Sequence, residues 1–499
     1  MRTSRTFLAA LLVFGCSESD PAPGPGNPTS SGPDAGYGDA GPQIPILQGG
    51  RTVRVLPGNP GLVGITSDEH LITRDGTLIM AAPLVEGAKP TTIVDTGRVV
   101  LIRGSVVFVW SDVDYETGLG ELLVWSAAGG AHALGRAPFA EDSVAASDDG
   151  RWVMYLQNTD ETTADLVISD VNFQAPQTLV SGMGRGGQDT CRPNYRFVGD
   201  RAFVAWCPPG SRDGAFQRFL PPSGGGPWSA EMMAQAIQPR WDSDQTGDRV
   251  IYITNGSQAI FVDGKDSVEV DNSVGWATLL PDGSAALYRV GDQLRRSPLP
   301  EVDPEPVVTT NFRLPVAFTP SYDHVVYSTA VVYEEGERRD LYLADTTGFN
   351  PQPLILASDP SARLPAVPIT TDGGWLLYYD ELRTRAEGAT LNARRIGSEE
   401  SLSFPNVYDA KVARDGLVVI SDNRSNPDQW PVVADLKLLD LSADAGVAMI
   451  EERVIDGSAF FVGPHGDRVI YLRSGVDAEG NQDRDAQGVY MMVLPDADD

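Results

Sequence analysis

The sequence has few of the residues that nucleic-acid binders and zinc proteins depend on. Among its 499 residues, 38 are Lys or Arg and 68 are Asp or Glu, so the formal net charge is -30. Phosphate binding depends on clustered Lys and Arg, and this balance excludes nucleic acid as a partner. Only four histidines occur, and neither a His-x-x-x-His nor a Cys-x-x-Cys pair is present. Zinc sites are built from such pairs, so none is expected.

The chain also lacks any run of about 20 apolar residues, the length that a membrane-spanning helix requires. Arg2 and Arg5 precede a short apolar run that ends at Gly15. This pattern is typical of a secretory signal peptide, which we assign to residues 1–15. The segment Val13-Phe14-Gly15-Cys16 resembles the lipobox of bacterial lipoproteins, in which the cysteine becomes the first mature residue and carries acyl chains. We therefore expect lipidation of Cys16; an ordinary signal peptide with an incidental cysteine is the alternative.

Residues 17–42 contain almost no apolar side chains and many Pro, Gly, Ser and Asp residues. Such a segment cannot bury enough surface to fold, so we expect a disordered tether over residues 16–50, in which segment 17–42 spans about 28 Å. Ser17 after the cysteine is similar to the sorting signal for the outer membrane. We therefore expect an outer-membrane lipoprotein, bound to the membrane through its N-terminal lipid. Its folded body, residues 51–499, would face the periplasm or the cell surface.

Cysteine is scarce, with three in the whole chain. If Cys16 is lipidated, Cys191 and Cys207 remain as a pair in an exported protein, and a disulfide between them is expected. A hairpin centred on Gly199 would place position 191 opposite position 207. Two free thiols are the alternative.

A short phrase recurs along the chain, as in SDDGRWVMYLQ at 147–157 and GPHGDRVIYLR at 463–473. Its turn falls at eight positions: Gly150, Gly199, Gly247, Gly283, Asp323, Gly373, Gly416 and Gly466. The mean spacing is about 45 residues, the period of a propeller blade of four strands. The unit 315–357 contains four short β-prone segments separated by turn residues. One stretch, EMMAQAI at 231–237, has instead the composition of a short helix.

The second strand of each unit is apolar on both sides, as in RVIYIT at 249–254. A strand in a sheet with one exposed face would alternate apolar and polar residues. Neighbouring blades cover both faces of a propeller blade. We therefore predict an all-β fold, a β-propeller of about eight four-stranded blades. Seven to ten blades are possible, because segments 58–95 and 96–138 are weaker repeats.

The phrases P-V-A-F-T-P at 315–320, L-P-D-G at 280–283 and S-D-D-G at 147–150 resemble repeats of the TolB-type propeller, part of the wider WD-repeat-like group. The resemblance covers about residues 143–494 and implies the propeller fold.

Long acidic loops at 111–121 and 475–488 join second to third strands, so we expect them on one face of the disc. The candidate binding residues on this face are Asp112, Asp114, Tyr115, Glu116, Asp477, Glu479, Asp483 and Asp485. Oxygen ligands at alternate positions can bind Ca²⁺, and here they would be Asp477, Glu479, Asn481 and Asp483. The alternative is a solvated acidic face without metal. No other cofactor is expected.

The sequence shows no catalytic constellation and no Gly-x-Ser-x-Gly motif. We therefore expect a monomeric, non-enzymatic scaffold that binds an unknown envelope protein or glycan. Propellers also host enzymes. The alternative is an envelope enzyme of the glycosidase or lyase type, with carboxylates in the propeller channel.

Overall fold

The computed structural model describes residues 50–114, 116, 119–138, 144–158, 163–170, 176–184, 193–222, 226–308, 312, 314–333, 336–346, 352–355, 369–370, 372–379, 388–414, 416–423, 425, 432–441, 446–455, 460–475, 481 and 483–494. The predicted signal peptide and all but the last residue of the predicted tether lie outside this part of the chain. Every regular element described is a β-strand. No helix long and apolar enough to cross a membrane occurs among the described residues.

Most strands form four-stranded antiparallel sheets in which neighbours along the chain are neighbours in the sheet. Two such sheets come first: β2 (Gly61–Ile65), β3 (His70–Asp75), β4 (Leu78–Pro83) and β5 (Thr91–Val94); and β6 (Arg98–Arg103), β7 (Val106–Asp114), β8 (Leu119–Ser126) and β9 (Gly130–Pro138). Three more follow: β10 (Val144–Ala146), β11 (Trp152–Asn158), β12 (Thr163–Asp170) and β13 (Gln177–Gly184); β21 (Val274–Leu279), β22 (Ala285–Val290), β23 (Gln293–Pro298) and β24 (Glu305–Val308); and β25 (Leu314–Phe318), β26 (His324–Tyr333), β27 (Gly336–Asp345) and β28 (Gln352–Ile355). A three-stranded sheet of β29 (Trp375–Tyr379), β30 (Ala389–Arg395) and β31 (Ser401–Val407) is extended by a bridge from Ile369 to Leu376.

Two larger sheets each contain two such meanders. The first runs through β14 (Asn194–Val198), β15 (Arg201–Trp206), β16 (Gly214–Leu220), β17 (Ser229–Ser243), β18 (Arg249–Thr254), β19 (Ala259–Asp263) and β20 (Asp266–Asp271). The second contains β32 (Asp409–Arg414), β33 (Leu417–Asp422), β34 (Val433–Asp440), β35 (Gly446–Ile455), β36 (Phe461–Val462), β37 (Arg468–Arg473), β38 (Gly488–Val493) and β1 (Arg51–Pro57).

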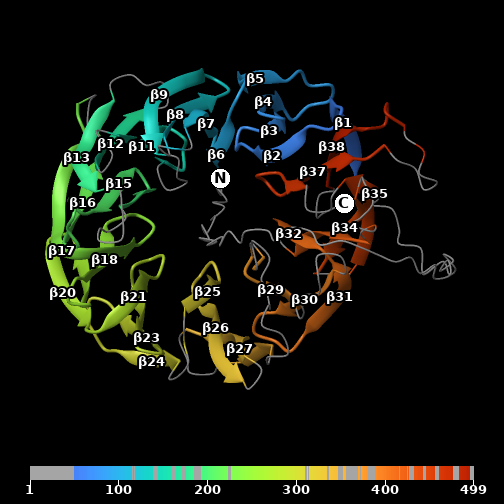
Figure 1. Cartoon of the computed structure of the whole chain (residues 1–499). Coiled ribbons are helices and arrows are strands. Elements are labelled where there is room, and N and C mark those ends of the chain that lie inside the picture. Colours follow the sequence, from blue (N-terminus) through green and yellow to red (C-terminus); the bar gives the residue numbers. More distant parts are fainter. Residues whose placement is uncertain are drawn as a thin grey trace, which may run out of the picture.

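Figure 1 shows these sheets arranged as a ring about a central axis, with first strands such as β6, β25 and β32 innermost and β5, β9 and β31 at the rim. The structure is a β-propeller. The predicted all-β class is confirmed, and the blade number stays a prediction.

The expected helix at 231–237 is wrong. These residues belong to β17, which pairs with β16 from Leu220↔Ser229 to Gly214↔Ile237. It pairs with β18 from Ile237↔Thr254 to Ser243↔Val250, with a register shift between Ile237 and Trp241. Met, Ala and Gln have high intrinsic helix propensity, but tertiary context routinely overrides propensity. Backbone pairing with the edge of β16 overrides that preference.

The core is distributed between the sheets. Val106, Phe108 and Trp110 on β7 pack against the sheet of β10–β13, in a cluster with Val153 and Tyr155. The alternate residues Val107 and Val109 pack against the sheet of β2–β5. All five residues of β7 named here are at most 2% exposed. This arrangement explains why second strands are apolar on both sides.

A shared turn joins first to second strands. The amide of Gly150 donates to the carbonyl of Ser147 (2.9 Å), and the hydroxyl of Ser147 accepts from the amide of Trp152 (2.9 Å). The seven predicted glycines all have positive φ. At the eighth position the prediction is wrong by one residue, because Tyr322 and not Asp323 has positive φ (58°). Counting from Thr319, whose carbonyl accepts from the amide of Tyr322 (2.9 Å), Tyr322 takes the place of glycine.

The ring is closed by strands from opposite ends of the sequence. β1 pairs with β38 from Arg51↔Val493 to Pro57↔Gly488. Val55 and Leu56 on β1 are buried, and they pack with Leu71 of the next sheet. β1 therefore covers the edge of β38 and contributes to the seam with β2–β5.

Deletion of residues 51–57 should lower the melting temperature by at least about 5 °C, because it exposes the edge of β38 and removes two buried apolar side chains. Thermal denaturation followed by circular dichroism measures this. Deletion of residues 43–49, which leaves β1 intact, is the control. Equal melting curves for the two deletions would contradict this closure.

Asp323 makes the stability of the turn after β25 depend on pH. Burial acts to raise its pKa, but hydrogen bonds from Thr319 (2.5 Å) and Ser321 (2.7 Å) outweigh burial and lower the pKa to about 2. The pKa in the unfolded chain is about 3.9, so the charged form stabilises the fold above about pH 4. That stabilisation is lost as the pH falls through about 2.

Asp323→Asn should therefore melt below the parent at pH 7, and the difference should shrink between pH 4 and pH 2. Thermal melts across this range measure it, with the exposed Asp266→Asn as control. A difference that is independent of pH would show that the charge of Asp323 does not contribute.

Candidate functional site

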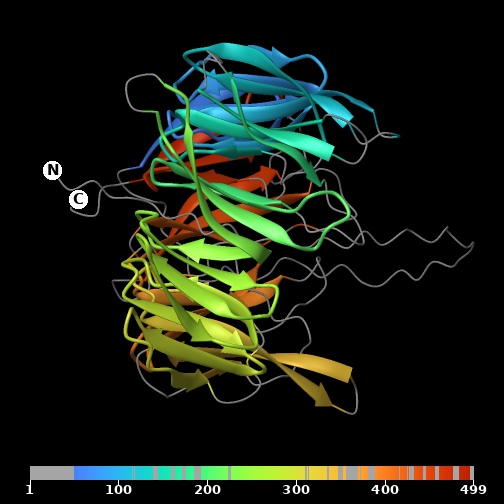
Figure 2. The same cartoon turned by 90° about the vertical axis from the view of Figure 1, so that its left-hand side faces the viewer.

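The predicted acidic loops leave the same face of the ring. Loop 111–121 joins β7 to β8 and loop 475–488 joins β37 to β38, and in both cases these are the second and third strands of a meander. We call this side the loop face. The side that carries the first-to-second-strand turns, such as 147–152, is the turn face. The β26–β27 hairpin also ends on the loop face, and Figure 2 shows it projecting beyond the body of the ring.

In the first acidic loop, the carboxylate of Asp114 accepts a hydrogen bond from the amide of Glu116 (2.9 Å). Asp112 lies where the β7–β8 register shifts, and it has positive φ (47°). Tyr115 lies outside the described residues. Asp114 therefore shapes the backbone of its own loop.

The second acidic loop is organised in the same way. The carboxylate of Asp483 accepts from the amides of Asp485 (2.9 Å) and Ala486 (3.3 Å), and Arg54 donates to the carbonyl of Asp485 (2.7 Å). Of the predicted calcium ligands, Asn481 and Asp483 are described, whereas Asp477 and Glu479 are not. The part of the chain that the structure describes holds no group of three or more His, Cys, Asp or Glu residues placed for a metal ion. Calcium binding stays a prediction.

The predicted disulfide involves one described residue. Cys207 is fully buried after β15. The β14–β15 hairpin pairs Asn194 with Ala205 and Val198 with Arg201, so its centre lies between Gly199 and Asp200. Cys191 and Cys16 lie outside the described residues. The disulfide and the lipidation stay predictions.

A cluster that we did not predict from the sequence lies at the inner edge of the ring, on the first strands of successive meanders. Arg196 on β14 forms an ion pair with Asp242 on β17. The hydroxyl of Thr278 on β21 donates to the other oxygen of Asp242, which also accepts from the amide of Leu279 (3.3 Å). One carboxylate thus links three first-strand segments that are 36 to 46 residues apart in sequence.

Aromatic rings continue this cluster. The Arg196 guanidinium lies 4.3 Å from the centre of the Trp241 ring. Trp276 and Phe318 are stacked at 6.3 Å between ring centres, and Phe318 and Tyr322 at 4.6 Å, with interplanar angles of 11° and 9°. Burial and the charge of Asp242 raise the pKa of Tyr322 to about 12, so its hydroxyl is protonated at neutral pH.

A second cation lies at the inner edge, on β32. The ammonium of Lys411 lies 4.3 Å and 4.9 Å from the ring centres of Phe460 and Phe461, donates to the carbonyl of Phe460, and lies 3.5 Å from Asp409. Burial lowers the pKa of Lys411, against the effect of Asp409. These contacts surround the ammonium with groups from β32 and the start of β36.

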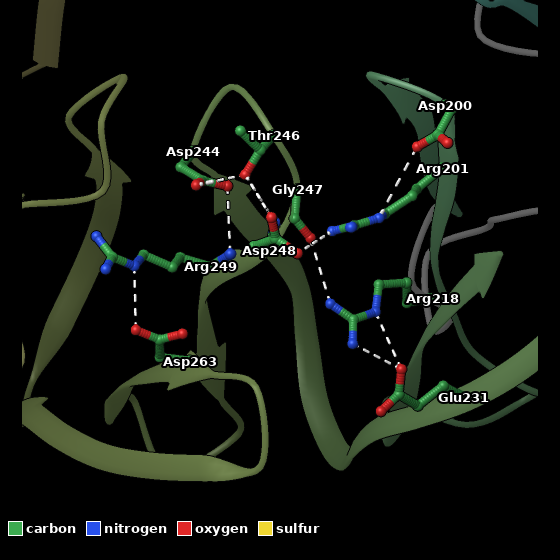
Figure 3. A network of polar contacts seen from close by, with 10 residues as sticks. All are labelled: Asp200, Arg201, Arg218, Glu231, Asp244, Thr246, Gly247, Asp248, Arg249 and Asp263. Atoms are coloured by element: carbon green, nitrogen blue, oxygen red, sulfur yellow. Dashed lines mark hydrogen bonds and ion pairs between the residues drawn. The ribbon is translucent and has the colours of Figure 1, made fainter.

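On the turn face, a polar network joins the meanders β14–β17 and β17–β20 (Figure 3). Its ion pairs are Arg201–Asp248 (2.7 Å), Arg218–Glu231 (2.6 Å) and Arg249–Asp263 (3.0 Å). Arg218 also donates to the carbonyl of Gly247 (3.3 Å), inside the neighbouring turn. The hydrogen bond from Arg201 holds the pKa of Asp248 below its usual value. Because these charges pair within the network, we interpret it as structural.

No protein-family model matches the chain. No curated protein matches it. The chain is similar to several solved structures, among them an oligogalacturonate lyase in complex with manganese, at 11% identity over 90% of this chain and 98% of that one (TM-score 0.36). Another is TolB from Acinetobacter baumannii, at 12% identity over 58% of this chain and 76% of that one (TM-score 0.29). A third is Porphyromonas gingivalis dipeptidyl peptidase 4, at 9% identity over 79% of this chain and 60% of that one (TM-score 0.44).

These similarities concern the propeller class alone, and the expected TolB-type resemblance is supported at that level. At such identities and TM-scores, no site or activity is transferred to this chain.

Proposed function

We propose that the chain is a lipid-anchored scaffold of the cell envelope that binds its partner on the loop face. The observation that carries this proposal is the position of residue 51. Arg51 pairs with Val493, which pairs with Arg468 at the start of β37, directly after a first-to-second-strand turn. The described chain therefore begins on the turn face. A tether from Cys16 would join there, and the loop face would point away from the anchoring lipid.

The projecting hairpin supports a binding role for the loop face. Among the residues that the structure describes, β25 pairs with β26 as far as Ser328, and β28 pairs with β27 at residues 341–343. The β26–β27 pairing continues to Tyr333↔Gly336. Beyond its neighbours the hairpin is a two-stranded ribbon, which is marginally stable by itself. Binding residues concentrate on loops that a rigid scaffold positions, and a partner on this face would hold the ribbon.

The charge of the loops favours a basic or polyhydroxylated partner over an anionic one. An envelope protein or a glycan meets this requirement. The carboxylates at the inner edge belong to the alternative, an enzyme of the glycosidase or lyase type. Two candidates there are Asp242 and Asp409, and each is engaged by a cation of the same chain, Arg196 or Lys411. We therefore prefer the scaffold.

Cys16→Ala should move the protein from the membrane fraction to the soluble fraction, because several acyl chains anchor stably and their loss leaves no anchor. Fractionation with a carbonate wash measures the change, and Ser19→Ala in the predicted tether is the control. A Cys16→Ala variant that stays in the membrane would contradict lipid anchoring.

The loop face is tested by a pull-down from detergent-solubilised envelope with the soluble propeller as bait. Replacement of Asp112, Asp114, Asp477 and Asp483 together by Asn should abolish partner recovery. The matched control removes four exposed acids at third-to-fourth-strand turns on the turn face: Asp266, Glu301, Asp303 and Glu399. It makes the same change in net charge.

Circular dichroism verifies that both variants are folded. If the loop-face variant recovers partners as well as the parent does, or if only the control loses them, the working surface is not the loop face.

A further inference from the structure

We propose that the inner edge of the ring between β14 and β25 binds a neutral sugar residue, through the Arg196–Asp242 pair and the stacked rings of Trp276, Phe318 and Tyr322. This site lies near the turn face and is separate from the loop face on which the proposed scaffold function depends. Its residues come from four first-strand segments in a row, β14, the end of β17, β21 and β25, and from the turn after β25.

The residues of the site lie at a similar position along their strands, near the turn face. Arg196, Asp242, Thr278 and Phe318 each lie within a few residues of the turn that ends their strand. Direct contacts join neighbouring members, from Arg196 to Asp242, from Asp242 to Thr278, and from Trp276 to Phe318. Trp276 and Thr278 are alternate residues of β21 and share one side of that strand, so the polar and aromatic parts of the cluster adjoin there.

The ion pair leaves hydrogen-bonding capacity open. The side chain of Arg196 is 45% exposed, although one face of its guanidinium lies against Trp241. In contrast, Arg218 in the turn-face network is 11% exposed. One oxygen of Asp242 accepts from Thr278 and Leu279, while the other accepts from Arg196. A carboxylate oxygen accepts about two hydrogen bonds, so the oxygen facing Arg196 can accept one more.

A donor beside an acceptor matches the vicinal hydroxyls of a sugar. One hydroxyl can accept from the guanidinium, and its neighbour can donate to the carboxylate. Hydrogen bonds to charged groups are stronger than those between neutral groups. The stacked rings supply the apolar part of such a site. Trp276, Phe318 and Tyr322 are only partly buried. The C–H face of a pyranose can lie on a flat aromatic surface, and small-molecule sites combine such surfaces with a few polar groups.

The charge of the site selects against ionic ligands. Arg196 and Asp242 neutralise one another, and the net charge of -30 on the whole chain repels polyanions. A cationic ligand would meet the exposed guanidinium. A neutral sugar can form hydrogen bonds with both Arg196 and Asp242 without adding charge.

The test uses the soluble propeller on an array of immobilised neutral, acidic and amino oligosaccharides, followed by tryptophan fluorescence titration with the neutral glycans that bind. Arg196→Ala should weaken binding about tenfold or more, since it removes hydrogen bonds to a charged group. Trp276→Leu, which removes the ring at one end of the stack while it keeps an apolar side chain, should also weaken binding. Arg151→Ala is the matched control, because its guanidinium also lies over an indole, 5.4 Å from the ring centre of Trp152.

The loop-face variant with four Asn substitutions should retain full sugar binding, which separates this site from the proposed scaffold function. Melting curves verify that each variant is folded. Failure of the parent to bind any neutral glycan would overturn the proposal. Equal binding by the parent and Arg196→Ala, or loss of binding in the loop-face variant, would also overturn it.

Discussion

Packing of one sheet against the next is the interaction on which the rest of this structure depends. Each meander presents apolar residues on both faces, as the alternation of Val106, Phe108 and Trp110 with Val107 and Val109 on β7 shows. Such a sheet cannot be stable in isolation, because one face or the other would be exposed to water. Every sheet therefore needs two neighbours, and the last sheet has to pack against the first. The pairing of β1 with β38 meets this requirement and places residue 51 beside the end of the last strand.

The positions of the ion pairs between sheets follow from the same packing of one sheet against the next. Turns at neighbouring seams approach closely enough that a Cβ on Gly466 would lie 1.9 Å from the carbonyl oxygen of Ala413. Arginines at these seams reach acids on the next unit, as in Arg103–Asp148 (2.6 Å), Arg201–Asp248 (2.7 Å) and Arg468–Glu69 (2.9 Å). Exposed pairs contribute little to stability individually. Their value here is that they pair the few cations of a strongly acidic chain at positions where backbones converge.

The repeat and the apolar second strands were sufficient to predict the fold class, because that class depends on local composition and period. Two local predictions failed for physical reasons. Helix-favouring residues at 231–237 were recruited into β17 by the edge of β16, and Tyr322 occupies a position that the pattern reserves for glycine. The inner-edge cluster could not be predicted. Arg196, Asp242 and Thr278 come together only through the lateral order of the sheets, and a single sequence does not show which side chains face the axis. The part of the cluster that a single sequence does show is an aromatic residue shortly before a first-to-second-strand turn, at Trp241 and Phe318.

The proposed anchoring and the proposed binding need different faces of a disc-shaped protein. The strand order of a meander places the attachment point and the long loops on opposite faces. First-to-second-strand turns and third-to-fourth-strand turns share one face, and second-to-third-strand loops emerge on the other. Closure through an outer fourth strand brings the N-terminal side of residue 51 to the turn face, at the rim. The proposed tether would attach there, and it would cross neither the loop face nor the inner edge where Arg196 and Asp242 lie. The closure that completes the hydrophobic packing therefore also leaves both proposed binding surfaces accessible to partners.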